Sequence, residues 1–240
     1  MFEKLKKAGF QVKTLHHAEA ILKHDMKEVV VDLERVLLSV SIPIEELVRG
    51  GGGEGELTQR IRKALTDRKW EKHVFEIKKI VDGKERESLS HEIDHVRKLP
   101  NGTIALEIEW NNEDLFFDGD LRTFKRLHAD GAISIGAIIT RGTTLQEGLR
   151  DLVESFALKH KIDSLEKITR FYTPTTRQRK IIADAAASKG SFQKGWAHAF
   201  VSDKFGEATT HWRKLEERVA RGFGNPCPLL LIGIPRDVVH

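Results

Sequence analysis

The chain has 240 residues, which suits one large domain or one domain with an added arm. Its hydrophobic content of 40% is enough for a core, and its formal charge of +4 leans weakly toward polyanionic partners. A single cysteine, Cys227, excludes an intrachain disulfide and a thiolate metal site, and suits a reducing compartment. We find neither a signal peptide nor a run of about 20 apolar residues, so we expect a cytoplasmic protein that contacts no membrane.

The first part of the chain, about residues 1–70, is expected to be helical. Apolar residues recur at helical spacing from His17 to Val40, and Ser41-Ile42-Pro43 ends that helix. A second helix is predicted from Glu54 to Asp67. The glycines at 50–53 predict a flexible break between the two. They do not form a phosphate loop, because no Gly-Lys-Ser/Thr follows them.

Residues 71–142 change from helical to strand periodicity and are expected to form the core of the domain. The predicted strands are Val74–Val81, Ser88–Arg97, Thr103–Trp110 and the apolar Ala132–Thr140, with a helix at Asp120–Ala129. Pro100-Asn101-Gly102 predicts a tight turn between the second and third strands. This order predicts an α/β fold with a central mixed sheet flanked by helices.

Residues 143–240 are less regular, and we expect them to complete the sheet of a single domain spanning 1–240. A helix is predicted at Thr144–His160 and another at Ala208–Arg221. Pro174–Lys180 is interpreted as a basic loop. The apolar segment Pro228–Ile234 predicts a late buried strand that closes the sheet.

Two glutamates share one face of the predicted strand 103–110. Alternate side chains of a strand point the same way, so Glu107 and Glu109 oppose the face of Ile104, Leu106 and Ile108. Two acids on one side of an otherwise apolar strand are unusual. The alternative interpretation is that both simply face solvent on a half-exposed sheet.

Asp94 on the preceding strand is expected to join these glutamates. If the hairpin turns on Asn101-Gly102, Asp94 lies opposite Glu109; if it turns on Pro100-Asn101, Asp94 lies opposite Glu107. Either register places the three carboxylates within about 4.5–8 Å of one another, although a three-residue turn or a bulge would change the parity. Such a cluster needs a hard cation, Mg²⁺ first, then Mn²⁺ or Ca²⁺.

The spacing also fits a known signature. Asp94, twelve residues and then Glu107-Ile108-Glu109 fit the PD-(D/E)XK nuclease pattern, with Glu109 in place of the usual lysine. Longer blocks are similar to the type II restriction endonucleases of the BglII/BstYI family. These blocks are Ile104–Asn111, the Phe116/Phe117 pair, Ala137–Gly142 and Arg221–Ile234. The family's usual Glu-x-Gln is here a BamHI-like Glu-x-Glu.

The resemblance implies a restriction-endonuclease-like fold, with the catalytic core at about 71–142 and a DNA-contacting part at about 143–240. It also implies a homodimer that cuts double-stranded DNA at a short palindrome, with a GATC-centred site as the guess. A cognate DNA methyltransferase would be its functional partner. On this hypothesis Asp94, Glu107 and the carbonyl of Ile108 hold Mg²⁺, Mn²⁺ substitutes, and Ca²⁺ supports binding only. Glu109 orients or deprotonates the attacking water, and the products carry 5′-phosphates. His73, just past Trp70, is the nearest match to a further metal-adjacent position.

Candidate DNA contacts lie in three segments. Asn111 and Asn112 follow the catalytic strand and could pair with adenine or simply form a turn. Arg141, Thr143 and Thr144 begin the loop from which the family reads bases. A basic run is assigned to phosphate contact, with an ordinary solvated loop as the alternative; its residues are Arg177, Arg179 and Lys180.

Three rival functions remain open at this point. A structure-specific repair or junction nuclease would use the same core. A non-catalytic DNA-binding protein would carry a decayed site, which the intact Asp94, Glu107 and Glu109 argue against. A protein-interaction module would leave these acids on its surface. His91 and His95 share the strand of Asp94 and could be ligands or surface residues.

Overall fold

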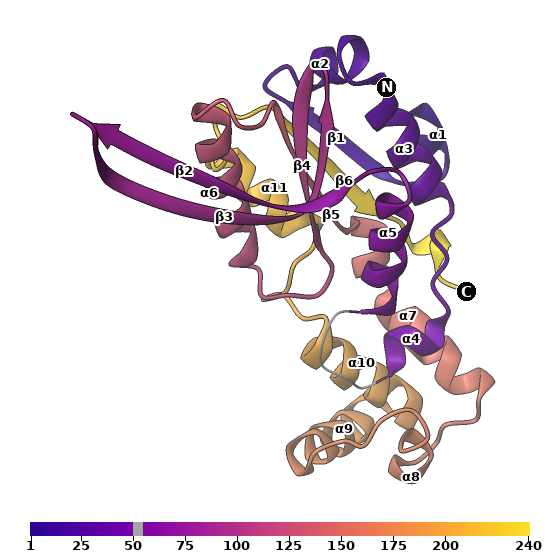
Figure 1. Ribbon diagram of the computed structural model, residues 1–240. Coiled ribbons are helices and arrows are strands. Elements are labelled where there is room, and N and C mark those ends of the chain that lie inside the picture. The colour runs from indigo at the N-terminus through magenta and orange to yellow at the C-terminus, as the bar shows by residue number, and fades with distance from the viewer. Residues whose placement is uncertain (50–54) are drawn as a thin grey trace.

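The computed structural model describes residues 1–49 and 55–240, and in this part of the chain six strands form one mixed sheet (Figure 1). The order across the sheet is β1-β6-β5-β4-β3-β2. Their bounds are β1 Gln11–Leu15, β2 Glu71–Val81, β3 Lys84–Leu99, β4 Gly102–Glu109, β5 Ile135–Arg141 and β6 Leu229–Ile234. Strands β4, β5 and β6 run parallel, and the other neighbours pair antiparallel. The predicted α/β fold with a central mixed sheet is confirmed.

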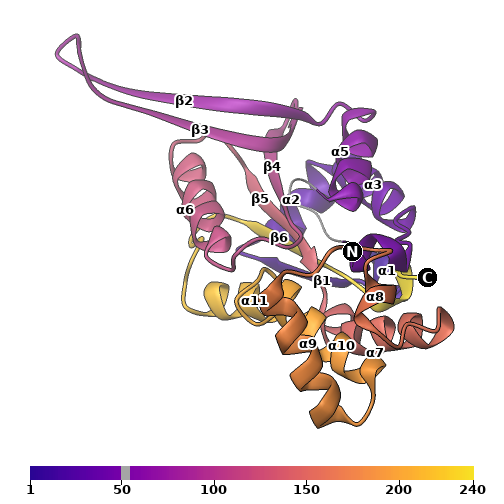
Figure 2. The same cartoon turned by 90° about the horizontal axis from the view of Figure 1, so that it is seen from below.

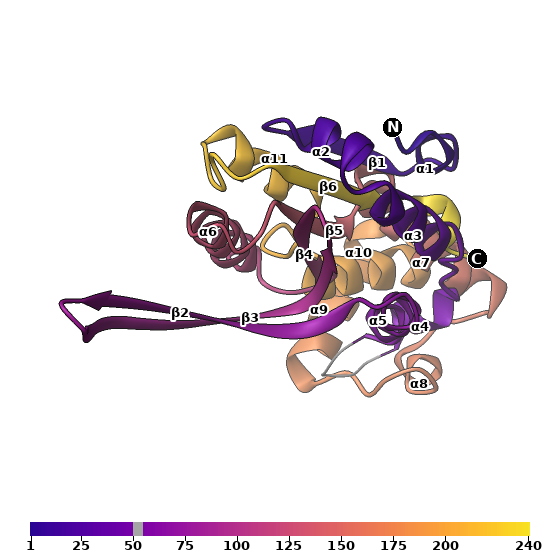
Figure 3. The same cartoon turned by 45° about the horizontal axis from the view of Figure 1, so that its top comes forward.

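Helices cover both faces of this sheet, as Figures 2 and 3 show. One face packs on apolar side chains of α3 (Lys27–Leu38), α5 (Glu56–Thr66) and α7 (Thr143–Lys159), together with Ile104, Leu106 and Ile108 of β4. The opposite face packs on α6 (Phe116–Ala129) and α11 (Trp212–Ala220). Strand β4 therefore lies between two cores, and the end of β4 is held from both sides.

Two predictions near the chain ends need correction. The expected helix His17–Val40 is two helices, α2 (Ala18–His24) and α3, because Asp25 ends the first and the buried Met26 leaves the helical conformation. The apolar stripe of α3 is buried in the core. Strand β6 completes the sheet but lies inside it, because β1 adds an edge strand that we did not predict.

The expected basic loop Pro174–Lys180 is also wrong in part, because α9 (Thr176–Lys189) begins inside it. Thr175 accepts a hydrogen bond from the backbone of Gln178, and the Gln178 side chain accepts one from the backbone of Thr175. This reciprocal capping box starts the helix there. The helix packs on α10 (Phe192–Lys204), away from the sheet (Figure 1).

The remaining helical segments are short. They are α1 (Glu3–Lys7), α4 (Ile44–Val48), α8 (Leu165–Ile168) and the 3-10 turn Arg236–Val238. Our expectations for Glu54 and for the glycines at 50–53 lie outside the described residues. No helix of the described chain has the length and apolar character needed to cross a membrane.

The β2–β3 hairpin extends well beyond the body of the protein as a two-stranded arm (Figures 1 and 2). It turns at Asp82 and Gly83, which both adopt positive φ, as a tight turn requires. Strand β3 is longer than predicted mainly at its outer tip, where Lys84–Glu87 are exposed and lack the hydrophobic alternation on which the prediction relied. Strand β2 is longer than predicted at its inner end, where it begins at Glu71. Only the inner half of the arm contributes to the site.

Candidate active site

The hairpin register settles which glutamate faces Asp94. Leu99 pairs with Gly102, so the chain turns on Pro100-Asn101, and His95 pairs with Leu106. One step further along, Asp94 faces Glu107, and its backbone N–H donates to Glu107 Oε1 at 3.4 Å. Glu107 and Glu109 share the face of β4 opposite the core residue Leu106, as the strand periodicity predicts.

The pairing of β2 with β3 is interrupted at this level by a bulge. Glu71 pairs with Val96 and His73 with Ile93, so Lys72 alone stands against two residues, Asp94 and His95. Bulges next to active sites redirect side chains, and here Lys72 is turned into the cleft beside Asp94. Lys72 Nζ lies 2.6 Å from Glu92 Oε1 and 3.7 Å from Asp94 Oδ1.

A fourth carboxylate, Asp120, enters the site from α6, and our sequence reasoning missed it. It shares a hydrogen bond with Glu109, while its Oδ2 is buried without a partner. Burial and the neighbouring Glu109 and Glu107 raise the pKa of Asp120 to about 9. An acid early in a helix is ordinarily a dipole partner, so the sequence offered no signal that this one faces β4.

The buried acids of the cluster bind protons more tightly than free carboxyl groups do. Burial, then the charge of Asp94, raises the pKa of Glu107 to about 8, and burial raises the pKa of Glu109. No three histidine, cysteine or acidic side chains in the described chain converge on a single point. Asp94, Glu107 and the carbonyl of Ile108 stay the predicted ligands of a cation, with water completing the set. This all-oxygen set is the kind that hard divalent cations prefer.

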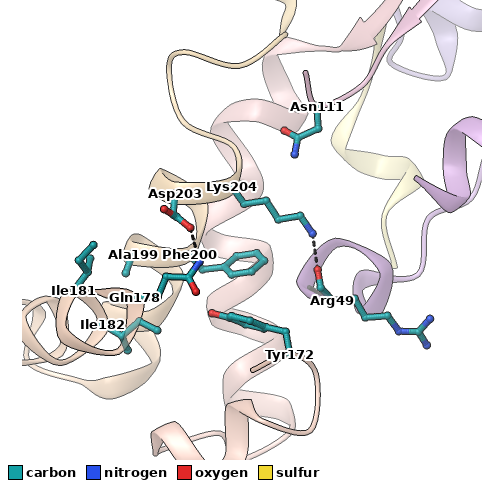
Figure 4. A pocket seen from close by; sticks show the side chains of 10 residues that line it. All are labelled: Arg49, Asn111, Tyr172, Gln178, Ile181, Ile182, Ala199, Phe200, Asp203 and Lys204. Atoms are coloured by element: carbon teal, nitrogen blue, oxygen red, sulfur yellow. Dashed lines mark hydrogen bonds between the residues drawn. The ribbon is translucent and has the colours of Figure 1, made fainter. Parts of the chain in front are cut away.

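These acids lie in an open cleft of about 1010 Å³, lined also by α4, α5, α6 and the end of α10. A smaller pocket of about 230 Å³ adjoins it, with Arg49, Asn111 and Lys204 lining both (Figure 4). Lys204 Nζ donates to the carbonyls of Leu47 at 2.9 Å and Arg49 at 2.6 Å, which ties α10 to α4. These two hydrogen bonds hold α4 and α10 together on the side of the cleft away from the sheet.

The loop after β4 is held by a buried cation. Arg141 is fully buried and donates to the Trp110 carbonyl at 2.9 Å and to Asn111 Oδ1 at 2.6 Å. Burial lowers the pKa of Arg141 to about 9. Arg141 is therefore a support for the cleft floor, which corrects our expectation that it contacts DNA. Asn112 Nδ2 donates to Glu109 Oε2 at 2.8 Å, so this asparagine orients a site acid.

The other predicted residues lie away from the acids. Thr143 and Thr144 begin α7, where the Thr143 N–H donates to Gln11 Oε1 at 2.6 Å and Thr144 Oγ1 accepts from the Arg236 N–H at 3.2 Å. The basic residues Arg177, Arg179 and Lys180 are exposed on α9.

The histidines of this region also lie apart from the cleft. His73 packs edge-on against Phe75, so Lys72, and not His73, lines the cleft past Trp70. His95 is buried beneath the hairpin, and burial lowers its pKa.

One comparison with known proteins identifies a family for this chain. The family described as restriction endonuclease BglII/BglIII matches residues 10–234, which is nearly the whole chain. No curated protein sequence matches it. Restriction endonucleases of this kind generally use divalent metal ions. The chain therefore belongs to the BglII/BglIII family of restriction endonucleases and is a type II site-specific deoxyribonuclease.

Proposed function

We propose that this enzyme makes Mg²⁺-dependent double-strand breaks at a short palindrome and leaves 5′-phosphates. The observation that carries the proposal is the set of carboxylates on one face of β3 and β4 in an open cleft. Asp94, Glu107 and the Ile108 carbonyl would hold the cation. A GATC-centred palindrome is the recognition site that we expect.

A bound divalent cation would acidify a water molecule and stabilise the negative charge that develops on the phosphate. Glu109 would orient that water and accept its proton. Asn112 and Asp120 hold the Glu109 carboxylate by hydrogen bonds, so its direction does not depend on the substrate. The water oxygen bonds to phosphorus as the bond from phosphorus to the 3′ oxygen breaks.

Sequence recognition is proposed for the cleft rim. Asn111 keeps its amide nitrogen, and Asn112 its amide oxygen, for base edges, because the other atom of each amide is engaged by Arg141 or Glu109. Thr143 and Thr144 at the start of α7 are proposed as further DNA contacts. The exposed Arg177, Arg179 and Lys180 of α9 suit phosphates.

A homodimer is part of this proposal, because a two-fold protein matches the symmetry of a palindrome. Light scattering of the protein alone and bound to a cognate duplex tests it. A single copy in both states would refute the dimer without affecting the assignment of the acids.

The experiment for the proposed function is plasmid digestion with Mg²⁺, followed by sequencing of the cut ends. Discrete bands and one common end sequence are expected; a smear would favour a structure-specific nuclease, and binding without cutting a non-catalytic protein. Asp94→Asn and Glu107→Gln should abolish cleavage while keeping specific binding, because they remove cation ligands and no basic contact. Cleavage by either variant near the wild-type rate refutes the site assignment.

A further inference from the structure

The active-site cleft is acidic, whereas its substrate is a polyanion. Asp94, Glu107, Glu109 and Asp120 all line it, and a divalent cation bound by Asp94 and Glu107 would offset only the charges of those two ligands. A phosphodiester that approaches these acids therefore needs further positive charge from the protein itself.

Several cationic side chains line the cleft, but two of them already serve its walls. Lys204 Nζ is held by the carbonyls of Leu47 and Arg49, and the Arg49 guanidinium pairs with Glu56 at 3.0 Å. Lys72 differs in position, because its ammonium lies 3.7 Å from Asp94, one of the two proposed cation ligands.

Two features of Lys72 suit it to substrate contact. The bulge in β3 turns its side chain into the cleft at the level of Asp94. Its side chain is 57% exposed and is held by Glu92, which is outside the cluster of four acids. An exposed four-carbon stem can move its ammonium by several ångströms at little cost, since no buried contact is broken.

We propose that Lys72 is a further catalytic residue, whose ammonium leaves Glu92 when DNA binds and contacts a non-bridging oxygen of the scissile phosphate. This inference rests on the proposed function, since it takes Asp94 and Glu107 as the cation site. Lys72 keeps its proton throughout the reaction. It stabilises the charge that accumulates on the non-bridging oxygens as the water oxygen bonds to phosphorus and the 3′ oxygen leaves. Glu109 accepts the water's proton, and the 3′ oxygen takes a proton from solvent.

The test compares Lys72→Met, Lys72→Arg and a matched control, Lys78→Met. Lys78 lies on the same strand and also pairs with a glutamate, Glu85 at 3.5 Å, but it lies outside the cleft on the arm. Single-turnover cleavage is measured with Mg²⁺ and saturating protein, and affinity is measured with Ca²⁺. Lys72→Met should lower the rate roughly 100-fold while changing the affinity less than about fivefold. Lys72→Arg should recover at least about tenfold of that loss, and Lys78→Met should stay within about twofold of wild type.

A second measurement separates contact with phosphate from support of the site. An uncharged methylphosphonate is placed at the scissile position, and its Kd is compared with that of the normal duplex in Ca²⁺. Wild type should lose about tenfold in affinity, and Lys72→Met clearly less, because the variant has no ammonium to lose. If the methylphosphonate lowers the affinity of wild type and of Lys72→Met by the same factor, the contact between Lys72 and the scissile phosphate is refuted. Equal rate losses in Lys72→Met and Glu92→Gln would likewise reduce Lys72 to a structural ion pair.

Glu107→Gln keeps the two claims distinguishable. If Glu107→Gln still cuts, the proposed active site is wrong. If Glu107→Gln is inactive and Lys72→Met cuts at the wild-type rate, the site stands and only the role of Lys72 is refuted.

Discussion

Replacing Asp120 by asparagine should stabilise the metal-free enzyme, although the position lies in its active site. The pKa of Asp120 is raised from 3.8 to about 9, first by burial and then by Glu109 and Glu107. The folded protein therefore binds this proton more tightly than the unfolded chain, and stability falls as pH rises from about 4 to 9. At pH 7 the penalty is 3.2 pKa units at about 1.36 kcal/mol each, or about 4 kcal/mol as an upper bound. Because Glu109 shares the proton, we expect a gain on the order of 2–4 kcal/mol.

That gain corresponds to a rise in melting temperature of roughly 5–15 °C for a protein of this size. It is measured by thermal unfolding in EDTA at pH 5 and pH 8, and it should be larger at pH 8. Asp118→Asn is the control, because Asp118 Oδ1 accepts a 2.5 Å hydrogen bond from Arg218 and its loss should destabilise the protein. A gain that is equal at both pH values, or a loss of stability, would refute the electrostatic reasoning.

Three further predictions concern the cation, the loop after β4 and a buried histidine. Calcium should support specific binding without cleavage and magnesium should restore cutting; efficient cleavage in calcium or in EDTA, measured on gels, would contradict the metal mechanism. Asn112→Ala should slow single-turnover cleavage about tenfold, because Glu109 loses its 2.8 Å hydrogen-bond partner. Arg179→Ala should instead weaken binding to all DNA sequences alike and lower the salt dependence of the binding constant by about one. The reverse pattern in the rate and binding assays would exchange the two roles. Burial, then the charge of Arg141, lowers the pKa of the buried His211 to about 4, so the protein should lose stability as pH falls from about 6.5 toward 4, by about 3 kcal/mol at most. In urea unfolding, the stability of His211→Gln should depend less steeply on pH than that of the wild type; an unchanged pH dependence would show that His211 does not cause the loss.

The acids of β4 could be predicted from the sequence because their arrangement is local. A two-residue period assigns Glu107 and Glu109 to one face, and a short turn leaves only two registers for Asp94, both on that face. Strands β5 and β6 could also be predicted, because strands buried on both faces are continuously apolar in sequence.

The missed residues depend on structure that no local pattern records. Asp120 joins Glu109 only because α6 folds back over the sheet, and Lys72 enters the cleft only because one residue of β2 stands against two of β3. Strand β1 was missed because its five residues are all half-buried and show no alternation. Arg141 was misassigned because its charge suggested an exposed position, whereas neutral oxygens satisfy it inside the protein.

The place of β6 inside the sheet joins segments that lie far apart in the sequence. Leu229–Ile234 fills the gap between β1, which begins at Gln11, and β5, which supports the catalytic strand. Without β6, strand β1 would have no partner in the sheet and β5 would present an open edge. The pairing of Gln11 with Gly233 spans most of the described chain, so closing this edge of the sheet costs far more loop entropy than closing the local β2–β3 hairpin. The strand that supports β5, and through it β4, therefore depends on residues from both ends of the described chain.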